Sequence, residues 1–225
     1  MGAAVGQMLT SAVGIAMSPI PLIAIVLMLA TPRGKGNGTA FTSGWVLSIA
    51  VITVVIVLVG ARADAHQQGT PAAWVHWVKL ALGALFVVLG ARQWRGRPKG
   101  DQEPALPGWM QAIDAFTPIK AAGLAVVLSA ANPKNLVLAV GGAVSIAGAT
   151  ASASAKLVAG VLFVLIASLC TAVPLAVYLV GGRRSAAVLQ SWKTWMAAHN
   201  GAIMTVLLLV LGVKYVGDAL GGLSA

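Results

Sequence analysis

Long apolar runs separated by short polar breaks constrain the fold of this chain more than any other feature. The runs reach about 18 residues or more, the length that a helix needs to cross the hydrocarbon core of a bilayer. They are continuous, whereas the strands of a membrane barrel alternate apolar and polar residues. The sequence therefore predicts an all-α integral membrane protein. With 59% hydrophobic and 9% charged residues, it has too little polar surface for a water-soluble domain.

The apolar runs predict six membrane-spanning helices in a single transmembrane domain, residues 1–225. This domain divides into one half at 1–94, a cytoplasmic connection at 95–117 and a second half at 118–225. No connection is long enough to form a separate domain. The six predicted spans are Ala4–Ala30, Phe41–Gly60, Trp74–Trp94, Pro118–Ala147, Lys156–Val180 and Gly201–Leu220.

The formal net charge of +10, from 15 Lys+Arg against 5 Asp+Glu, is predicted to set the orientation in the membrane. With six spans, the first, third and fifth connections share one face. The positive-inside rule places the more basic face in the cytoplasm and both termini outside the plasma membrane. Because the charge records topology, we expect no nucleic-acid partner. The more basic face carries Arg33, Lys35, Arg92, Arg95, Arg97, Lys99, Lys120, Arg183, Arg184 and Lys193, and the opposite face carries Arg62, Lys79, Lys156 and Lys214.

Few residues are placed to hold a metal or a cofactor. Cys170 is the only cysteine, so one chain has neither an intrachain disulfide nor a cysteine-based metal site. His66, His76 and His199 are far apart in the sequence, although folding could still bring them together. The patterns of a phosphate loop, a Ser-His-Asp triad, HExxH and an EF-hand are missing, and no carboxylate lies mid-span. We therefore predict no enzyme activity, no cofactor and no resident metal.

Two predicted spans are interrupted at matching places. The first contains Ser18-Pro19-Ile20-Pro21, and the fourth contains Asn132-Pro133-Lys134-Asn135. Three spans in each half give the two halves opposite orientations. The pattern thus predicts a 3+3 inverted repeat with broken first and fourth helices, an arrangement typical of transporters whose binding site lies at the bilayer midplane. The alternative is a pair of proline kinks without function.

The residues at the two breaks predict a site for an anionic group. Ser18 and Asn132 are N-cap residues followed by proline, a combination that starts a new half-helix. The start of a half-helix carries unpaired N–H groups and the positive end of the helix dipole. Lys134 adds a full charge, at a depth where a lysine costs about 2.5–3.5 kcal/mol and so faces a cavity or a partner. The alternative is that Lys134 caps carbonyls freed by the break. The predicted substrate-binding residues are Ser18, Pro19, Pro21, Asn132, Pro133, Lys134 and Asn135.

Polar and aromatic residues near the span ends are further candidates. Lys214 and Asp218 are four residues apart, so a helix brings them together. With Asp64, which we expect at the same level, they predict an outer gate; the alternative is that these are solvated span ends. The tryptophans at span ends predict an aromatic belt at the membrane interface, with an aromatic ligand cage as the alternative. They are Trp45, Trp74, Trp77 and Trp94.

Several segments resemble one protein family. They are Thr31-Pro32-Arg33-Gly34 after a proline-rich first span, Pro107-Gly108-Trp109-Met110 with Ile113-Asp114, and Ala131-Asn132-Pro133-Lys134-Asn135-Leu136. With six spans over nearly the whole chain, they look like the GAP/Sap family, the peptidoglycolipid-addressing and sulfolipid-addressing proteins of actinobacteria. This family is placed in the LysE transporter superfamily. The Asn-Pro-Lys-Asn segment is the most specific part of the resemblance.

The resemblance implies export or surface addressing of an envelope glycolipid, an amphiphile with a polar and sometimes sulfated headgroup. The partners it implies are a membrane lipid or anionic amphiphile as substrate and a larger lipid exporter with its synthase. A homo-oligomer is a further expectation. Two alternatives stay open at this point. One is an efflux carrier for a small anion or amino acid, and the other is a scaffold subunit of a lipid exporter that does not itself transport.

Overall fold

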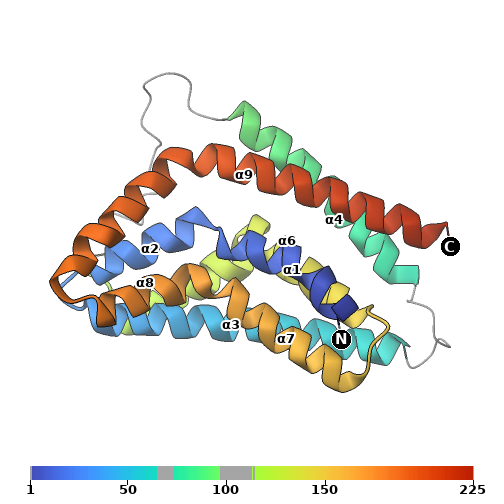
Figure 1. Ribbon diagram of the computed structural model, residues 1–225, viewed down its shortest axis with the longest axis horizontal. Coiled ribbons are helices and arrows are strands. Elements are labelled where there is room, and N and C mark those ends of the chain that lie inside the picture. The colour runs from blue at the N-terminus through green and yellow to red at the C-terminus, as the bar shows by residue number, and fades with distance from the viewer. Residues whose placement is uncertain (1, 65–72, 97–112, 114, 225) are drawn as a thin grey trace.

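The computed structural model describes residues 2–64, 73–96, 113 and 115–224, and within these ranges the regular elements are helices (Figure 1). The predicted all-α fold class is confirmed for this part of the chain. The helices of the first half are α1 (Gly2–Ala16), α2 (Pro19–Leu29), α3 (Gly34–Asp64) and α4 (Ala73–Arg95). Those of the second half are α5 (Pro118–Val126), the π-helical turn η2 (Val127–Ala131), α6 (Pro133–Ala147), α7 (Ala153–Ala167), α8 (Leu169–Val180), the 3-10 turn η3 (Gly182–Arg184) and α9 (Ser185–Leu223).

The helix is broken at both predicted proline positions. α1 and α2 meet at an angle of 41°, and the helix through η2 meets α6 at 68°. Ser18 and Asn132, the residues before the two prolines, have almost the same extended backbone, with φ and ψ of −75° and 113° in one and −73° and 115° in the other. Proline at the first position of each following helix explains the shared geometry, because it disfavours the α conformation in the residue before it.

A third break divides the fifth span at Ser168, a few residues before Thr171 and Pro174, where the sequence indicates a bend. α7 and α8 meet there at 58°. No proline or glycine stands at the break itself, and Pro174 lies inside α8, so the sequence indicates a bend in this span but not its position. α3 supports the break: the indole Nε1 of Trp45 donates a hydrogen bond of 3.2 Å to the Ala167 carbonyl. The prediction that Trp45 belongs to an interfacial belt is wrong, because its side chain is fully buried.

The last helix is longer than predicted. α9 runs without a break from Ser185 to Leu223, so the predicted fifth connection at 181–199 is largely helical and continuous with the sixth span. Its residues combine alanine, leucine and other good helix formers without an internal proline, which explains why the helix does not stop at the predicted boundary.

α4 and α9 pack along each other, at the upper edge of the molecule in Figure 1. Their backbones touch where Gly83 faces Gly212. A Cβ added to Gly83 would lie 3.0 Å from the Gly212 carbonyl oxygen, and one added to Gly212 would lie 3.1 Å from the Gly83 carbonyl oxygen. Two small residues thus let the helices approach closely, as in membrane helix pairs. Because α4 belongs to the first half of the chain and α9 to the second, this contact joins the halves.

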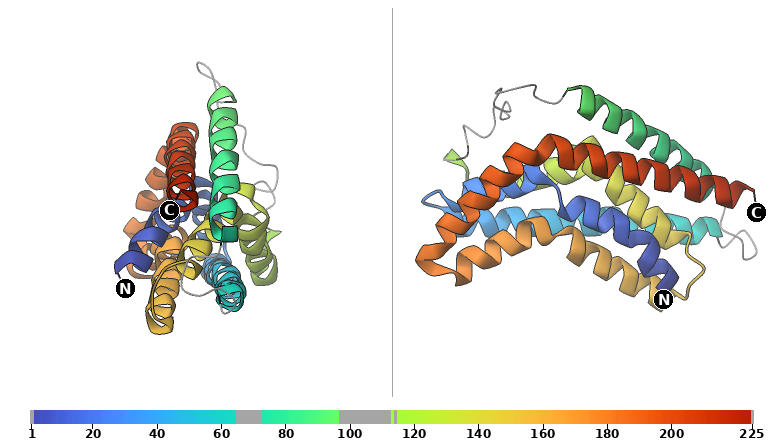
Figure 2. Two further views of the ribbon diagram at one scale, coloured as in Figure 1. Left: turned by 90° about the vertical axis from the view of Figure 1, so that its right-hand side faces the viewer. Right: turned by 45° about the horizontal axis from the view of Figure 1, so that its top comes forward.

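The remaining helices surround α1 and α6. α1 packs against α6 and α7, and α3 packs against α5 and α6. The core is apolar, and large apolar side chains also cover the outside of α3, α7 and α9, as expected for helices that face lipid rather than water. The N- and C-termini lie at the same end of the molecule in both figures (Figures 1 and 2).

Two helices, α3 and α9, are each long and apolar enough to cross a membrane. If each bent pair is one span, the described residues hold up to five, with α1 and α2, α5 to α6, and α7 and α8 forming the other three. This finding supports a membrane protein. α4 corresponds to the third predicted span, Trp74–Trp94, and is not among these five.

Candidate functional site

The first and fourth predicted spans each place a polar side chain at their break. Asn132 occupies the N-cap of α6, and its Oδ1 accepts a hydrogen bond of 3.1 Å from the backbone N–H of Lys134. Ser18 occupies the N-cap position of α2, but its hydroxyl makes no capping hydrogen bond. The Ser18 hydroxyl is therefore available to bond across to the other half of the chain.

The two breaks are joined by hydrogen bonds between side chains. The Lys134 ammonium donates to Ser18 Oγ over 2.8 Å, and the Ser18 hydroxyl donates to Asn135 Oδ1 over 2.8 Å. Ser18 and Asn135 are 2% and 1% exposed, so both bonds lie in the protein interior, where polar groups without partners would cost free energy. Of the seven predicted site residues, these three are brought into direct contact.

The backbone around the second break explains the position of Asn135. The π-turn η2 shifts the pairing so that the N–H of Asn132 donates to Val127, five residues back, over 3.1 Å. This leaves the carbonyl of Leu128 without its helical partner, and Asn135 Nδ2 donates to it over 2.9 Å. The amide nitrogen of Asn135 thus donates to the freed carbonyl, while its side-chain oxygen accepts the hydrogen bond from Ser18. Lys134 is not needed for this backbone repair.

Lys134 opens onto a cavity of about 340 Å³ between α2, α4, α6 and α9. Its lining combines polar and apolar residues. Among the described residues that line it there is no carboxylate. The polar lining consists of Arg92, Gln93, Asn132, Lys134 and Asn200, and the apolar lining consists of Ile20, Leu89, Gly96, Pro133, Met204 and Leu208.

Sequence reasoning missed three of the polar lining residues. It counted Arg92 only as a topology charge, and it assigned no role to Gln93 or Asn200. Arg92 lies in the last turn of α4, and Asn200 lies where the predicted connection was wrongly separated from the sixth span. Asn200 Oδ1 is buried and has no hydrogen-bond partner among the described residues, so it is free to accept a bond from a ligand in the cavity. A prediction of one continuous helix over Ser185–Leu223 would have placed Asn200 inside a span and so marked it as a candidate.

The predicted prolines have a backbone role. Pro19 and Pro21 are buried within α2 and are not part of the cavity lining, whereas Pro133 contributes an apolar surface to it. Their shared effect is to end one helix and start the next, which places Ser18 and Lys134 at the same level. The cavity is therefore formed by side chains, and the prolines set where those side chains lie.

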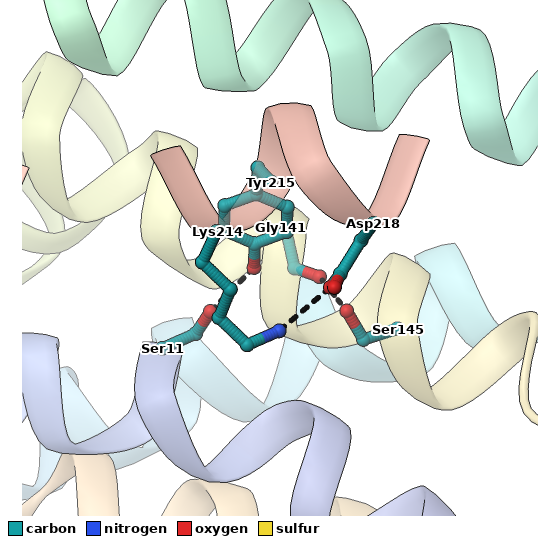
Figure 3. Close-up of polar contacts among 6 residues, drawn as sticks. All are labelled: Ser11, Gly141, Ser145, Lys214, Tyr215 and Asp218. Atoms are coloured by element: carbon teal, nitrogen blue, oxygen red, sulfur yellow. Dashed lines mark hydrogen bonds and ion pairs between the residues drawn. The ribbon is translucent and has the colours of Figure 1, made fainter. Parts of the chain in front are cut away.

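The second predicted cluster lies further along α9. Lys214 Nζ and Asp218 Oδ2 form an ion pair of 2.7 Å, as their spacing predicts (Figure 3). The side chain of Asp64, the third predicted gate residue, lies outside the described part of the structure, although α3 ends at this residue. Beside the ion pair, the Tyr215 hydroxyl contacts Ser11 Oγ of α1, and the Tyr215 ring packs near Gly141 of α6 (Figure 3).

The helical fold, its apolar exterior and the cation-lined cavity between bent helices define a polytopic membrane protein with a polar site in its interior. The chain belongs to the family described as Sap, sulfolipid-1-addressing protein, whose profile matches residues 8–221. The suspected resemblance is thus confirmed. The family's description names the addressing of a lipid rather than a chemical reaction. No curated protein and no solved structure matched the chain.

Proposed function

We propose that the protein is a transporter of the LysE superfamily that takes part in exporting an amphiphilic envelope lipid with an anionic headgroup, and that the cavity beside Lys134 binds this headgroup. The observation that carries the proposal is the pairing of Lys134 with Arg92 in a cavity whose described lining has no carboxylate. Two cations without an acidic neighbour favour an anion, because the partly buried Lys134 needs a partner of opposite sign and the exposed Arg92 adds a second positive charge to the same lining. A sulfate ester, as the family's description suggests, meets this requirement.

The chemistry of the lining residues suits such a headgroup. An arginine side chain presents a planar fork that donates two hydrogen bonds to a sulfate or phosphate, and a lysine adds a compact charge. The Lys134 ammonium already donates to Ser18, and it has further N–H donors available for a ligand. Gln93, Asn132 and Asn200 carry amides that can bond to sugar hydroxyls.

The apolar residues of the cavity lining favour an amphiphile over a small polar solute. Leu89, Met204 and Leu208 line the cavity together with the polar residues. A second groove of about 520 Å³, lined almost entirely by apolar residues of α3 and α7, gives the outside of the protein further room for acyl chains. An amphiphile buries its tail against such surfaces and gains about 0.8 kcal/mol per methylene.

We further propose that the domain is a 3+3 inverted repeat in which α4 is the sixth span. Exchanging the two halves of the chain relates α3 to α7 and α8, and α4 to α9. Several contacts follow this exchange: α3 packs on α5 as α7 packs on α1, α3 packs on α6 as α8 packs on α2, and α4 and α9 pack on each other. The matching backbone at Ser18 and Asn132 supports the same relation.

In this proposal the protein lies in the plasma membrane with its basic connections in the cytoplasm and both termini outside. The cavity lies toward the cytoplasmic end, since Arg92 precedes the third connection and Asn200 follows the fifth. It would then receive the headgroup from the inner leaflet. We propose that a larger lipid exporter and a lipid synthase act beside it, as its family resemblance suggests.

A deletion strain tests the proposed function. We expect one anionic envelope lipid to disappear from the surface extract while it remains in the whole-cell extract. The wild-type gene should restore it, and Lys134→Ala should leave less than about a tenth of the surface lipid, since losing a buried ion pair costs several kcal/mol. Lipid mass spectrometry of both extracts, with immunoblotting of the protein in membranes, measures these outcomes.

Lys120→Ala is the matched control, because Lys120 is an exposed lysine on α5. It should restore the surface lipid fully. Full restoration by Lys134→Ala as well would contradict a transport role for the cavity and favour a scaffold. Accumulation of a small anion or amino acid in the deletion strain, with normal surface lipids, would show a solute carrier instead.

A further inference from the structure

A second group of charged side chains lies where α4 and α9 run side by side, away from the cavity. We name His76, Lys79, Lys214 and Asp218 the α4–α9 charge cluster. Lys79 is 8% exposed, and it interacts electrostatically with both Asp218 and Lys214. Asp218 is ion-paired with Lys214 at 2.7 Å. Among the described side chains of the cluster, one carboxylate therefore faces two ammonium groups, and one positive charge is uncompensated.

His76 adds an unused polar atom to the cluster. It lies three residues before Lys79, on the same side of α4. Its Nδ1 is buried and has no hydrogen-bond partner among the described residues. The ring is confined by α9, since a Cβ on Gly222 would collide with it. A buried nitrogen without a partner and an uncompensated buried lysine are both unusual unless something else binds there.

The cluster and the cavity are separated by an aromatic layer. Along α9, the cavity uses Asn200 to Leu208, and Tyr215 follows before Asp218. Along α4, the order is Arg92 in the cavity, then Phe86, then Lys79. Phe86 and Tyr215 pack with ring centroids 5.8 Å apart, and both are almost completely buried.

The spacing along α4 sets the distance between the two cationic places. Arg92 and Lys79 are 13 residues apart, which corresponds to about 20 Å along the helix axis. Each place carries more positive than negative charge in its described side chains. The Phe86–Tyr215 ring pair lies between them along the two helices. The Tyr215 hydroxyl contacts Ser11 of α1 (Figure 3).

We propose that the α4–α9 charge cluster is a second binding site for the anionic headgroup, from which the lipid leaves toward the outside. This inference rests on the proposed function. Lys79 and Lys214 bind the sulfate or phosphate oxygens, and His76 donates a hydrogen bond to them. Asp218 holds Lys214 while the site is empty and competes with the anion for it. Passage from the cavity to this site requires the Phe86–Tyr215 layer to open.

Native mass spectrometry of the full-length protein in detergent tests the second site. The probe is a sulfated galactosylceramide, compared with uncharged galactosylceramide. The wild type should bind two sulfated lipids per chain. Lys79→Gln should bind one, Arg92→Gln should also bind one, and the double variant should bind none. Lys120→Gln, with its exposed side chain on α5, should still bind two. Retention of both lipids by Lys79→Gln would overturn the proposal.

Asp218→Asn distinguishes a binding site from a structural ion pair, and it covers the case in which Lys79→Gln fails to fold. Removing the competing carboxylate should tighten binding at the outer site about fivefold, the worth of one partly exposed ion pair. Unchanged or weaker binding would contradict the second site. If only Arg92→Gln leaves the count at two, the cavity is not a headgroup site and the proposed function fails while the cluster remains.

Discussion

At the scale of single residues, Lys134 depends on partners that come from distant parts of the chain. Ser18, which accepts its hydrogen bond, is 116 residues away, and Arg92 lines the same cavity from another helix. Asn135, and not Lys134, donates the hydrogen bond that satisfies the freed Leu128 carbonyl. The lysine is therefore not consumed by the backbone, which was the alternative explanation for its presence. In the proposed function, this charge binds the headgroup.

Arg92 gives a prediction at this scale. Arg92→Gln should lower binding of a sulfated glycolipid to the purified protein by about tenfold or more, because a charge-assisted hydrogen bond to a ligand contributes about 1.5–3 kcal/mol. Arg92→Lys should recover part of this loss, since lysine keeps the charge without the planar fork. Titration with the fluorescently labelled lipid gives the affinity.

Arg95→Gln is the control for Arg92. Arg95 lies in the same last turn of α4 and is exposed like Arg92, but it does not line the cavity. Its substitution removes the same net charge and should leave the affinity within about twofold, as expected for a solvated surface charge. Equal losses from both variants would show that only net charge matters, which would contradict a specific role for Arg92.

At the scale of the helices, the positions of the breaks at Ser18-Pro19 and Asn132-Pro133 could be predicted from the sequence, and the position of the break at Ser168 could not. The breaks at Ser18-Pro19 and Asn132-Pro133 can be recognised in the sequence because a proline interrupts the interior of a helix. The break at Ser168 has no such residue and depends on Trp45 reaching the Ala167 carbonyl from α3. The same limit applies to the cavity: Lys134 stood out as an isolated charge in an apolar run. Arg92 and Asn200 became visible only when packing brought α4 and α9 to that break.

The packing of α6 against α9 gives a second prediction. A Cβ on Gly141 would lie 2.5 Å from the Tyr215 hydroxyl oxygen, too close for either helix to keep its place. Gly141→Ala should therefore destabilise the protein by about 1–3 kcal/mol, the usual cost of overpacking. Tyr215→Phe removes the clashing oxygen but keeps the ring carbon Cζ, 2.8 Å from the added Cβ, so the double variant should regain only part of this stability. Thermal unfolding in detergent measures both changes.

Gly123→Ala serves as the control for Gly141→Ala. Gly123 is an exposed glycine of α5 with nothing within 4 Å of its added Cβ. Alanine should stabilise the helix there by up to about 1 kcal/mol through its higher helix propensity. If the double variant Gly141→Ala/Tyr215→Phe is no more stable than Gly141→Ala alone, the contact with the hydroxyl is not the cause of the loss.

At the scale of the whole molecule, the two ends differ in charge and in what they contain. Both termini lie at one end, and the turn η3 between α8 and α9 lies at the other (Figures 1 and 2). The six-span expectation depends on α4, since the described residues hold up to five spans by length and composition. With an even number of membrane crossings both termini lie on the same side of the membrane. The distribution of basic residues then determines which side that is.

Reporter fusions test this orientation. Alkaline phosphatase, which folds only outside the cytoplasm, should be active when fused after the C-terminal residue. The same enzyme fused after Arg184, in η3, should be inactive, while a green fluorescent protein at that position should fluoresce. These outcomes follow if the basic connections stay inside. Phosphatase activity after Arg184 would mean that the protein is inserted the other way round.

The contact between Gly83 and Gly212 has a mechanical consequence. Backbone atoms of both helices meet there, and the side chains beside them are those of Val87 and Val216, whose β-branching restricts their rotamers, so little side-chain movement can absorb a displacement. α4 and α9 are therefore coupled almost without slack, and a tilt of one is transmitted to the other. Because α4 and α9 come from opposite halves of the chain, the Gly83–Gly212 contact is a fixed point between the halves. In the proposed transport cycle the two halves move about this contact, and the Phe86–Tyr215 rings, three residues from Gly83 and Gly212, are the side chains beside it that have to move aside for the lipid.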